Sequence, residues 1–437
     1  FNKAINELSW DEAATLACLP KSPSSYNSAV GFKKLTTRRN LILYKLCEQG
    51  YLSQQELRLY KSKAIHFAKL EKGVSKAQYY TTAALEKITG QFSETDLKNG
   101  ADIVLNINQR LQEYSQHALR EGLIAYDESQ KEYNGVVTHL DSFESFKKFD
   151  LPFSIYDFEL GYVAIKHNKV FVKTKDHKEY QLCSGRWHIK EKLKNKDVVL
   201  IKVNNSVAHL KQIPCATGAV IAMEAGTGNI LALVGGWDFH LQQFNCATQA
   251  LRQPGSSFKP FVYLEAFEKG YTPETILDDS PITLIIDKHH TYKPKNATTM
   301  EYGNITVEKS FAKSLNRATV RMALDVGIEN ILDRAELFNV HHSKRKNPAL
   351  ILGAGITSLL NLTTAYAMIF NGGFYIKPRF YKSFFTPTGE SYNVEEFSVE
   401  SNNMQKITME SMQRKTRIVS FKSIAYMLQI MEKAVEY

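Results

Sequence analysis

Apolar residues in the first part of the chain have the spacing of amphipathic helices. This spacing covers Trp10 to Leu19 and Thr37 to Gly50, and a glycine commonly follows the end of a helix. Residues 1–65 are therefore predicted to be helical. Further on, Asp102–Gln109 has the pattern of a strand that leads into a helix from Gln109 to Ala125.

The pattern changes between residues 130 and 212, where the apolar runs become short. Gly161–Lys166, Lys169–Lys173 and Val198–Val203 are strand-like, and Asn, Asp, Lys and Gly separate them. Several short strands at close spacing predict a small β-barrel.

A β-hairpin is predicted after this region. Ala219–Met223 and Ile230–Val234 are apolar runs that flank a glycine-containing turn at Glu224–Asn229. Neither run alternates with polar residues, so we expect both faces of the hairpin to be buried.

A serine and a lysine then stand at the start of an apolar helix. Pro254-Gly255 breaks the preceding structure, and helical spacing of large apolar residues begins at Phe258. Ser256 is therefore predicted at a helix N-terminus, with Lys259 one turn later on the same face. Free backbone N–H groups at a helix start can stabilise an oxyanion, and a lysine in a dry site can accept a serine proton. This arrangement favours acyl transfer through a serine nucleophile.

A second polar group follows at Ser314-Leu315-Asn316, in a predicted loop between helices. The Ser314 hydroxyl can relay protons to a leaving amine, and the Asn316 amide can hold a substrate carbonyl. The alternative for Ser314 is a helix N-cap. Each short motif is weak by itself. Ser-x-x-Lys also occurs at Ser145, Ser310 and Ser343, and Ser-x-Asn also occurs at Ser25, Ser391 and Ser401.

Composition narrows the class of protein only slightly. The 437 residues carry a formal net charge of +10, with no compact basic stripe interleaved with aromatic residues, so nucleic acid is not an expected partner. The positive charge is compatible with an anionic membrane face or a pyrophosphate lipid. Five scattered cysteines indicate neither a zinc site nor a disulfide framework. No apolar run approaches the length of a membrane span.

Longer blocks of sequence resemble the class A bifunctional penicillin-binding proteins, of the 1A type. The segment Ala247–Phe261 is similar to the family's serine block. Further similar blocks are Leu8–Pro23 and Arg38–Leu41, which resemble the closing motifs of its glycosyltransferase domain, and Leu352–Gly355, Leu362–Ala367 and Asn371–Gly373, which resemble its later helix and turn.

The resemblance implies an α+β multidomain fold. Its parts are expected to be the C-terminal part of a lysozyme-like glycosyltransferase domain (1–65), a linker and the start of the transpeptidase region (66–129), an OB-like β-barrel insert (130–212) and a transpeptidase domain with an antiparallel sheet (213–437). It implies that Ser256 attacks a D-Ala-D-Ala stem peptide, with Lys259 as base, Ser314 as proton relay and Asn316 as substrate holder. The implied partners are peptidoglycan stem peptides and lipid II, with β-lactams as covalent inhibitors, and no metal or organic cofactor is implied. The implied location is the periplasmic side of a bacterial inner membrane, through an N-terminal membrane anchor upstream of the given residues.

The family's third block, Lys-Thr/Ser-Gly on a strand, is not found. The nearest match, Lys415-Thr416-Arg417, lacks the glycine and precedes the helix-like Ser423–Met431, whereas the family's block follows it. The sequence is therefore expected to be a fragment of the parent protein, cut at both ends and weak or inactive as an enzyme. Two alternatives stay open at this point: a serine β-lactamase-type hydrolase, and a non-catalytic remnant or scaffold.

Overall fold

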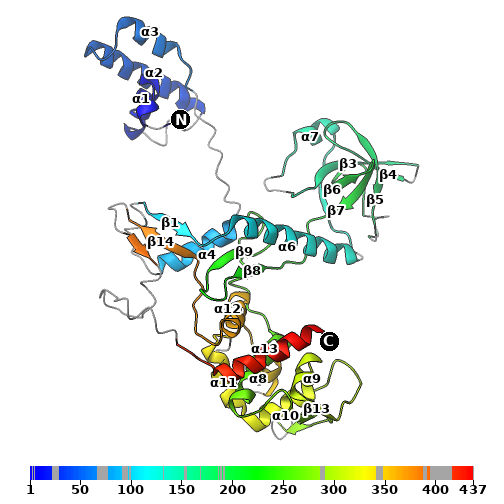
Figure 1. Cartoon of the computed structure of the whole chain (residues 1–437). Coiled ribbons are helices and arrows are strands. Elements are labelled where there is room, and N and C mark those ends of the chain that lie inside the picture. Colours follow the sequence, from blue (N-terminus) through cyan, green and yellow to red (C-terminus); the bar gives the residue numbers. More distant parts are fainter. Residues whose placement is uncertain are drawn as a thin grey trace. The chain divides into compact units, whose positions relative to one another are not determined.

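The computed structural model divides the chain into two compact units, residues 1–76 and 77–437 (Figure 1). The residues described are those of 1–436 other than 2, 4, 22–28, 66–76, 91–96, 98, 99, 131, 152–154, 168, 186, 188, 190, 191, 286–290, 341–347, 387–390 and 394–415.

The first unit is helical, as predicted. It contains α1 (Trp10–Leu16), α2 (Ala29–Glu48) and α3 (Gln54–Ser62), with short 3-10 turns at Ile5–Glu7 and Leu19–Lys21. Helix α2 begins at Ala29 and not at Thr37, so the predicted start was wrong. Capping boxes begin α1 and α3, because Ser9 pairs with Glu12 and Ser53 pairs with Glu56. A small core holds the helices together, built by Ala14, Leu43, Leu52 and Leu57.

The second unit begins with α4 (Gln78–Thr89), β1 (Asp102–Leu105) and α6 (Gln109–Ser129). Strand β1 pairs with β14 (Tyr381–Phe385), which also pairs with β15 (Ser391–Asn393). The predicted strand and helix at Asp102–Ala125 are confirmed, although the helix extends to Ser129.

A closed β-barrel follows, and the prediction of one is confirmed. Its strands are β2 (Val136–His139), β3 (Glu159–Lys166), β4 (Lys169–Lys173), β5 (Glu179–Cys183), β6 (Asp197–Asn204) and β7 (Val207–Lys211), with α7 (Phe143–Lys148) between β2 and β3. The strand order is β2-β6-β3-β4-β5-β7, and an additional β6–β7 pairing closes the ring. Leu123 of α6 packs against Phe158 and Trp237, so the barrel shares a core with α6.

The predicted hairpin is present as β8 (Val220–Met223) and β9 (Ile230–Val234), paired antiparallel. Strand β9 is almost fully buried, but every residue of β8 is half-buried, so the expectation that both strands would be enclosed was wrong for β8. Strand β9 is covered by α4 and α6. The buried Gln112 side chain bonds the backbone N–H and C=O of Leu233, and the Tyr80 hydroxyl donates to the carbonyl of Ile230.

A cluster of helices surrounds α8 (Lys259–Glu268), which is buried from Lys259 to Phe267 (Figure 1). The surrounding elements are α9 (Val307–Ala312), α10 (Asn316–Val326), α11 (Ile328–Leu337), α12 (Leu359–Phe370) and α13 (Phe421–Glu436), with 3-10 turns η3 (Gly255–Phe258) and η4 (Pro348–Leu352). Short strands β10 (Ile276–Asp278) and β13 (Asn304–Thr306) pair beside α9 and α10, and β11 (Leu284–Ile285) pairs with β12 (Thr291–Tyr292). Because α8 is enclosed on all sides, its first residues are held rigidly.

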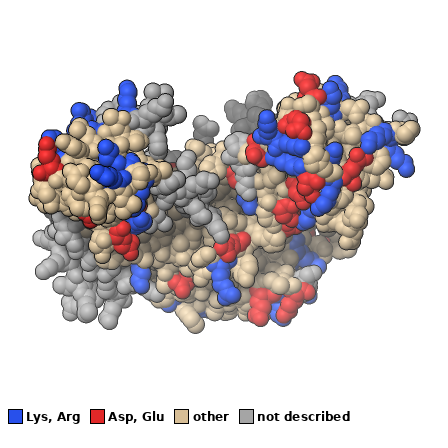
Figure 2. Space-filling view, turned by 90° about the horizontal axis from the view of Figure 1, so that it is seen from above, with Lys and Arg blue, Asp and Glu red and all other residues tan. Residues whose placement is uncertain are grey.

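Charged residues are mixed over the visible surface. In Figure 2, lysine and arginine side chains lie next to aspartate and glutamate side chains, and the described residues on that face form no continuous basic stripe. In the described part of the chain, no helix is both long enough and apolar enough to cross a bilayer.

Candidate active site

Ser256 lies on a single turn of 3-10 helix, η3, that runs directly into α8, and Lys259 is the first residue of α8. Ser256 is exposed, whereas the Lys259 side chain leads inward and the residue is only 2% exposed. The turn is anchored from two sides. The backbone N–H of Gly255 donates to the carbonyl of Gly353 at 3.2 Å, and the Tyr366 hydroxyl donates to the carbonyl of Ser257 at 3.0 Å. An exposed serine, Ser256, therefore lies one turn before a buried amine, that of Lys259.

The Ser314-Leu315-Asn316 segment lies at the junction of α9 and α10. Ser314 has a φ of +51° and is exposed, which turns the chain between the two helices. The N-cap of α10 is Leu315, which has no side-chain cap. The N-cap alternative for Ser314 was therefore wrong, and its hydroxyl instead bonds Lys259 and Ser256.

The buried Lys259 amine is the centre of a hydrogen-bond cluster. Its Nζ donates to the Ser314 carbonyl at 2.6 Å, the Ser314 Oγ at 2.9 Å and the Asn316 Oδ1 at 2.8 Å, with a longer contact to the Leu315 carbonyl at 3.3 Å. Burial lowers the pKa of the Lys259 amine from 10.5 to about 8, because the charged form loses its hydration. A usable fraction of neutral amine is then present near neutral pH.

Ser314 connects this amine to Ser256. The two hydroxyl oxygens lie 3.1 Å apart. Among the described contacts of Lys259, the hydrogen bonds go to residues 314–316, and the link to Ser256 runs through the Ser314 hydroxyl. The sequence analysis expected Lys259 to lie beside Ser256 on a helix face. The structure instead places Ser314 between them. Since each hydroxyl can both donate and accept, a proton can pass along Ser256, Ser314 and Lys259.

The backbone N–H of Ser256, in η3, is available to stabilise an oxyanion. No described residue accepts a hydrogen bond from the backbone N–H of Ser256. A free N–H beside a nucleophilic hydroxyl can stabilise negative charge that develops on an attacked carbonyl oxygen.

Three residues that the sequence analysis missed hold the first turn of α10, which carries Asn316. Asn296 and Asp279 bind the first turn of α10, and the Lys295 carbonyl accepts from the Asn316 side chain at 2.7 Å. They belong to strand-and-loop segments well upstream of the motif. No spacing rule connects them to Asn316, and only the packing of β10 against α10 brings them together.

Two other motif matches, Ser310 and Ser145, have described contacts, and neither forms a comparable site. Ser310 is fully buried and bonds the Tyr263 hydroxyl. Ser145 bonds Ser142 at the start of α7. Ser25, Ser343 and Ser401 lie outside the described residues. Among the described residues, no cluster of three His, Cys, Asp or Glu side chains could hold a metal ion.

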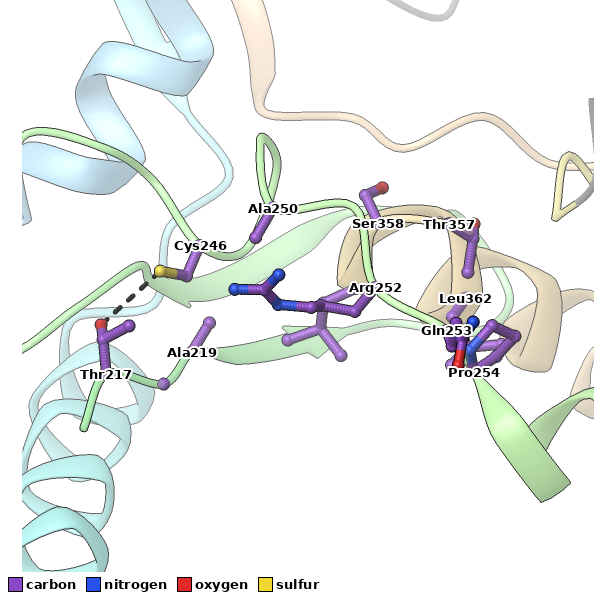
Figure 3. Close-up of a pocket in the computed structure, with 12 residues that line it drawn as sticks. Thr217, Ala219, Cys246, Ala250, Arg252, Gln253, Pro254, Thr357, Ser358 and Leu362 are labelled. Carbon is purple, nitrogen blue, oxygen red and sulfur yellow. Dashed lines mark hydrogen bonds between the residues drawn. The ribbon is translucent and has the colours of Figure 1, made fainter. Parts of the chain in front are cut away.

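A pocket of about 330 Å³ lies beside the segment that leads into η3 (Figure 3). Its walls come from the start of β8, the loop 246–254 and the start of α12, with Thr217, Cys246, Arg252 and Thr357 among them. Arg252 extends across it toward Ala219 in the view of Figure 3. Ser256, Lys259 and Ser314 do not line this pocket, so the candidate catalytic group is separate from it.

Known families match both parts of the chain. The family described as "Penicillin binding protein transpeptidase domain" matches residues 218–436, and the family described as "Transglycosylase" matches residues 1–47. The first match contains Ser256, Lys259, Ser314 and Asn316.

Relatives match along most of the chain. Penicillin-binding protein 1A of Rickettsia prowazekii is 31% identical over 395 residues, which cover 87% of this chain and 50% of that protein. Penicillin-binding protein 1A of Pseudomonas aeruginosa is 28% identical over 406 residues, which cover 86% of this chain and 49% of that protein. The chain therefore spans about half the length of the curated relatives it matches.

The fold has a solved counterpart. The crystal structure of penicillin-binding protein 1A from Haemophilus influenzae superposes with a TM-score of 0.75 at 25% identity, over 99% of this chain and 69% of that one. Together with the family matches, this agreement confirms the α+β multidomain fold, with a transglycosylase segment, a small barrel and a transpeptidase domain. The chain belongs to the class A penicillin-binding proteins of the 1A type, which join a transglycosylase to a transpeptidase domain.

Proposed function

We propose that the parent protein cross-links peptidoglycan as a serine D,D-transpeptidase. Ser256 attacks the carbonyl of the penultimate D-alanine in a stem peptide, and the peptide bond to the terminal D-alanine breaks. The products are an acyl-Ser256 ester and free D-alanine. The amine of a neighbouring stem peptide then attacks the ester, which forms the cross-link and restores the Ser256 hydroxyl.

The observation that supports this proposal most directly is the exposed Ser256 hydroxyl joined through Ser314 to a buried amine. Neutral Lys259 accepts a proton from Ser314 while Ser314 accepts one from Ser256, which raises the nucleophilicity of Ser256. In the reverse direction, Ser314 delivers the proton to the departing D-alanine nitrogen.

Asn316 is proposed to hold the substrate. Its Oδ1 is occupied by Lys259, and one Nδ2 hydrogen is donated to the Lys295 carbonyl. An amide nitrogen carries two hydrogens, so one is left for a carbonyl of the stem peptide.

The proposal also covers the transglycosylase segment, the location of the protein and its inhibitors. The transglycosylase segment belongs to a domain that polymerises glycan strands from lipid II, and the parent protein acts on the periplasmic side of the bacterial inner membrane, which it reaches through an N-terminal anchor. Penicillins and other β-lactams acylate Ser256, because their strained amide occupies the place of the D-Ala-D-Ala bond. No cofactor takes part.

Covalent labelling of the full-length protein with a fluorescent penicillin tests the proposal. We expect labelling to stop in Ser256→Ala and to persist in Ser257→Ala, the adjacent exposed serine. Mass spectrometry of the labelled peptide should place the adduct on Ser256. Labelling that persists in Ser256→Ala would reject the assigned nucleophile, and a properly folded protein that takes no label would favour a scaffold role.

A further inference from the structure

Helix α10, which begins with Asn316, receives its N-terminal partners from outside the helix. The first four N–H groups of a helix have no intrahelical acceptor, and Leu315 at the N-cap supplies none. The Asn296 Oδ1 instead accepts from the backbone N–H of Asn316 at 2.8 Å and of Arg317 at 3.3 Å. The Asp279 Oδ1 accepts from the N–H of Ala318 at 3.3 Å.

The two side chains that supply these acceptors are joined to each other. The Asn296 Nδ2 donates to the Asp279 Oδ2 at 2.8 Å. Asp279 is fully buried directly after β10, and its own N–H donates to the Gly303 carbonyl at 2.9 Å. A carboxylate can only accept, so Asp279 fixes the direction of the Asn296 amide: its NH₂ faces Asp279 and its oxygen faces the helix.

We propose that Asp279 and Asn296 are positioning residues that set the place of Asn316, and through Asn316 the direction of the Lys259 amine. This inference rests on the acyl transfer proposed above. Hydrogen bonds connect Asp279 to Lys259 in three steps. Asp279 orients Asn296, Asn296 holds the backbone of Asn316, and the Asn316 Oδ1 accepts from Lys259 at 2.8 Å. The Asn316 Nδ2 also donates to the carbonyl of Lys295, which directly precedes Asn296 in the chain.

The direction of these hydrogen bonds gives a sharp test. In Asp279→Asn, one of the two acceptor oxygens becomes an NH₂ that faces another donor, either the Asn296 amide or the Ala318 N–H. A flip of Asn296 would only move the conflict to the Asn316 N–H. In Asn296→Asp, two carboxylates face each other across 2.8 Å. Each single substitution therefore breaks the chain of partners while it keeps the size of the side chain.

The double substitution Asp279→Asn with Asn296→Asp restores every partner. The amide introduced at position 279 would donate its NH₂ to the carboxylate introduced at position 296, and its oxygen would accept from the Ala318 N–H. The second oxygen of that carboxylate would accept from the backbone N–H groups of Asn316 and Arg317. The total charge is unchanged, so the exchange of the two residues isolates the coupling between them.

Asp278→Asn serves as a matched control. Asp278 is the neighbour of Asp279 and also contacts α10, where it pairs with Arg321 at 3.0 Å. This pair is partly exposed and lies on a part of α10 away from Asn316. A general loosening of α10 would appear in this control, whereas loss of positioning would not.

The experiment has two readouts in the full-length protein. The first is hydrogen exchange of the peptide that contains Asn316–Ala318, followed by mass spectrometry. The second is the rate of acylation by a fluorescent penicillin. We expect each single variant to exchange this peptide faster and to acylate more slowly, each by about tenfold or more, since buried donors lose their acceptors. The exchange rates and acylation rates of the double variant and of Asp278→Asn should stay within about threefold of those of the unsubstituted protein.

The outcomes separate the two proposals. Exchange and acylation near the parental values in both single variants would overturn the positioning role, and so would a folded double variant that recovers neither readout. If a single variant fails to fold, the double variant decides alone by the same criteria. If the parent takes no penicillin on Ser256, the proposed function fails, and the exchange pattern still decides whether Asp279 and Asn296 hold the start of α10.

Discussion

The Ser314 hydroxyl lies 3.1 Å from the Ser256 hydroxyl and also accepts from the buried Lys259 amine at 2.9 Å. The exposed serine and the buried base are thus connected through a third residue, more than 50 positions later in the chain. This relationship makes Ser314 a required member of the proposed acylation step.

Removal of the Ser314 hydroxyl should therefore slow acylation strongly. We expect Ser314→Ala to lower the rate of penicillin acylation by about 10²–10⁴-fold, the range for loss of a proton-transfer group. Stopped-flow fluorescence would measure it, with Ser257→Ala as the control. A Ser314→Ala rate within threefold of the parent would show that Lys259 reaches Ser256 without Ser314.

The acylation rate should depend on the charge of Lys259. Burial lowers the pKa of this amine to about 8, and only the neutral form can act as a base. The rate should therefore rise with pH and level off above about pH 8. Lys259→Arg should lose this rise together with most of the activity, because a guanidinium stays protonated. An unchanged pH profile in Lys259→Arg would contradict the assigned base.

The same amine should also give a pH-dependent term in folding stability. Between about pH 8 and pH 10.5 the unfolded chain keeps the Lys259 proton and the folded chain releases it. The free energy of unfolding should therefore rise with pH across this window. Across this window, the free energy of unfolding of the unsubstituted protein should rise by up to about 3 kcal/mol relative to that of Lys259→Met. Chemical denaturation at several pH values would measure this difference. A flat difference between the two proteins would show that the amine is not desolvated.

Gly353 should tolerate no side chain. Its φ is +78°, and an added Cβ would meet the Gly255 carbonyl oxygen at 2.0 Å, next to Ser256. We expect Gly353→Ala to destabilise the fold by about 1–3 kcal/mol and to slow acylation, because the η3 turn must move. Gly226→Ala is the matched control, since nothing lies within 4 Å of its added Cβ. Equal melting temperatures and rates for the two variants would contradict this account.

The barrel should be dispensable for acylation, but its removal should expose apolar side chains that it now covers. Replacement of residues 130–212 by a flexible polar linker should leave penicillin acylation within a few-fold. The replacement uncovers Leu123 and Trp237, whose partners include Phe158 at 6.1 Å from the Trp237 ring. We therefore expect stronger binding of an apolar dye and a lower melting temperature. Loss of acylation in a variant that remains folded by circular dichroism would place the barrel in the active site.

Local pattern was sufficient where neighbours in sequence are also neighbours in space. The spacing of apolar residues predicted the helix after Ser256, the hairpin Ala219–Val234 and the short strands of the barrel, because helix and strand periodicities are local properties. The breaker Pro254-Gly255 marked the serine turn for the same reason. The half-buried state of β8 could not be predicted, since burial depends on what packs against a strand.

The arrangement of the proposed catalytic group was only partly predictable from the sequence. The motifs identified Ser256, Lys259, Ser314 and Asn316, but their spacing did not show that Ser314 stands between the other serine and the lysine. That order follows from the packing of α8 against the junction of α9 and α10. Asp279 gave no signal in the sequence, because its proposed role depends on β10, which places a buried carboxylate at the start of a helix whose N-cap residue, Leu315, has no side-chain acceptor. The chain thus determined which chemical groups are present, and tertiary packing decided which of them touch and in which direction each hydrogen bond runs.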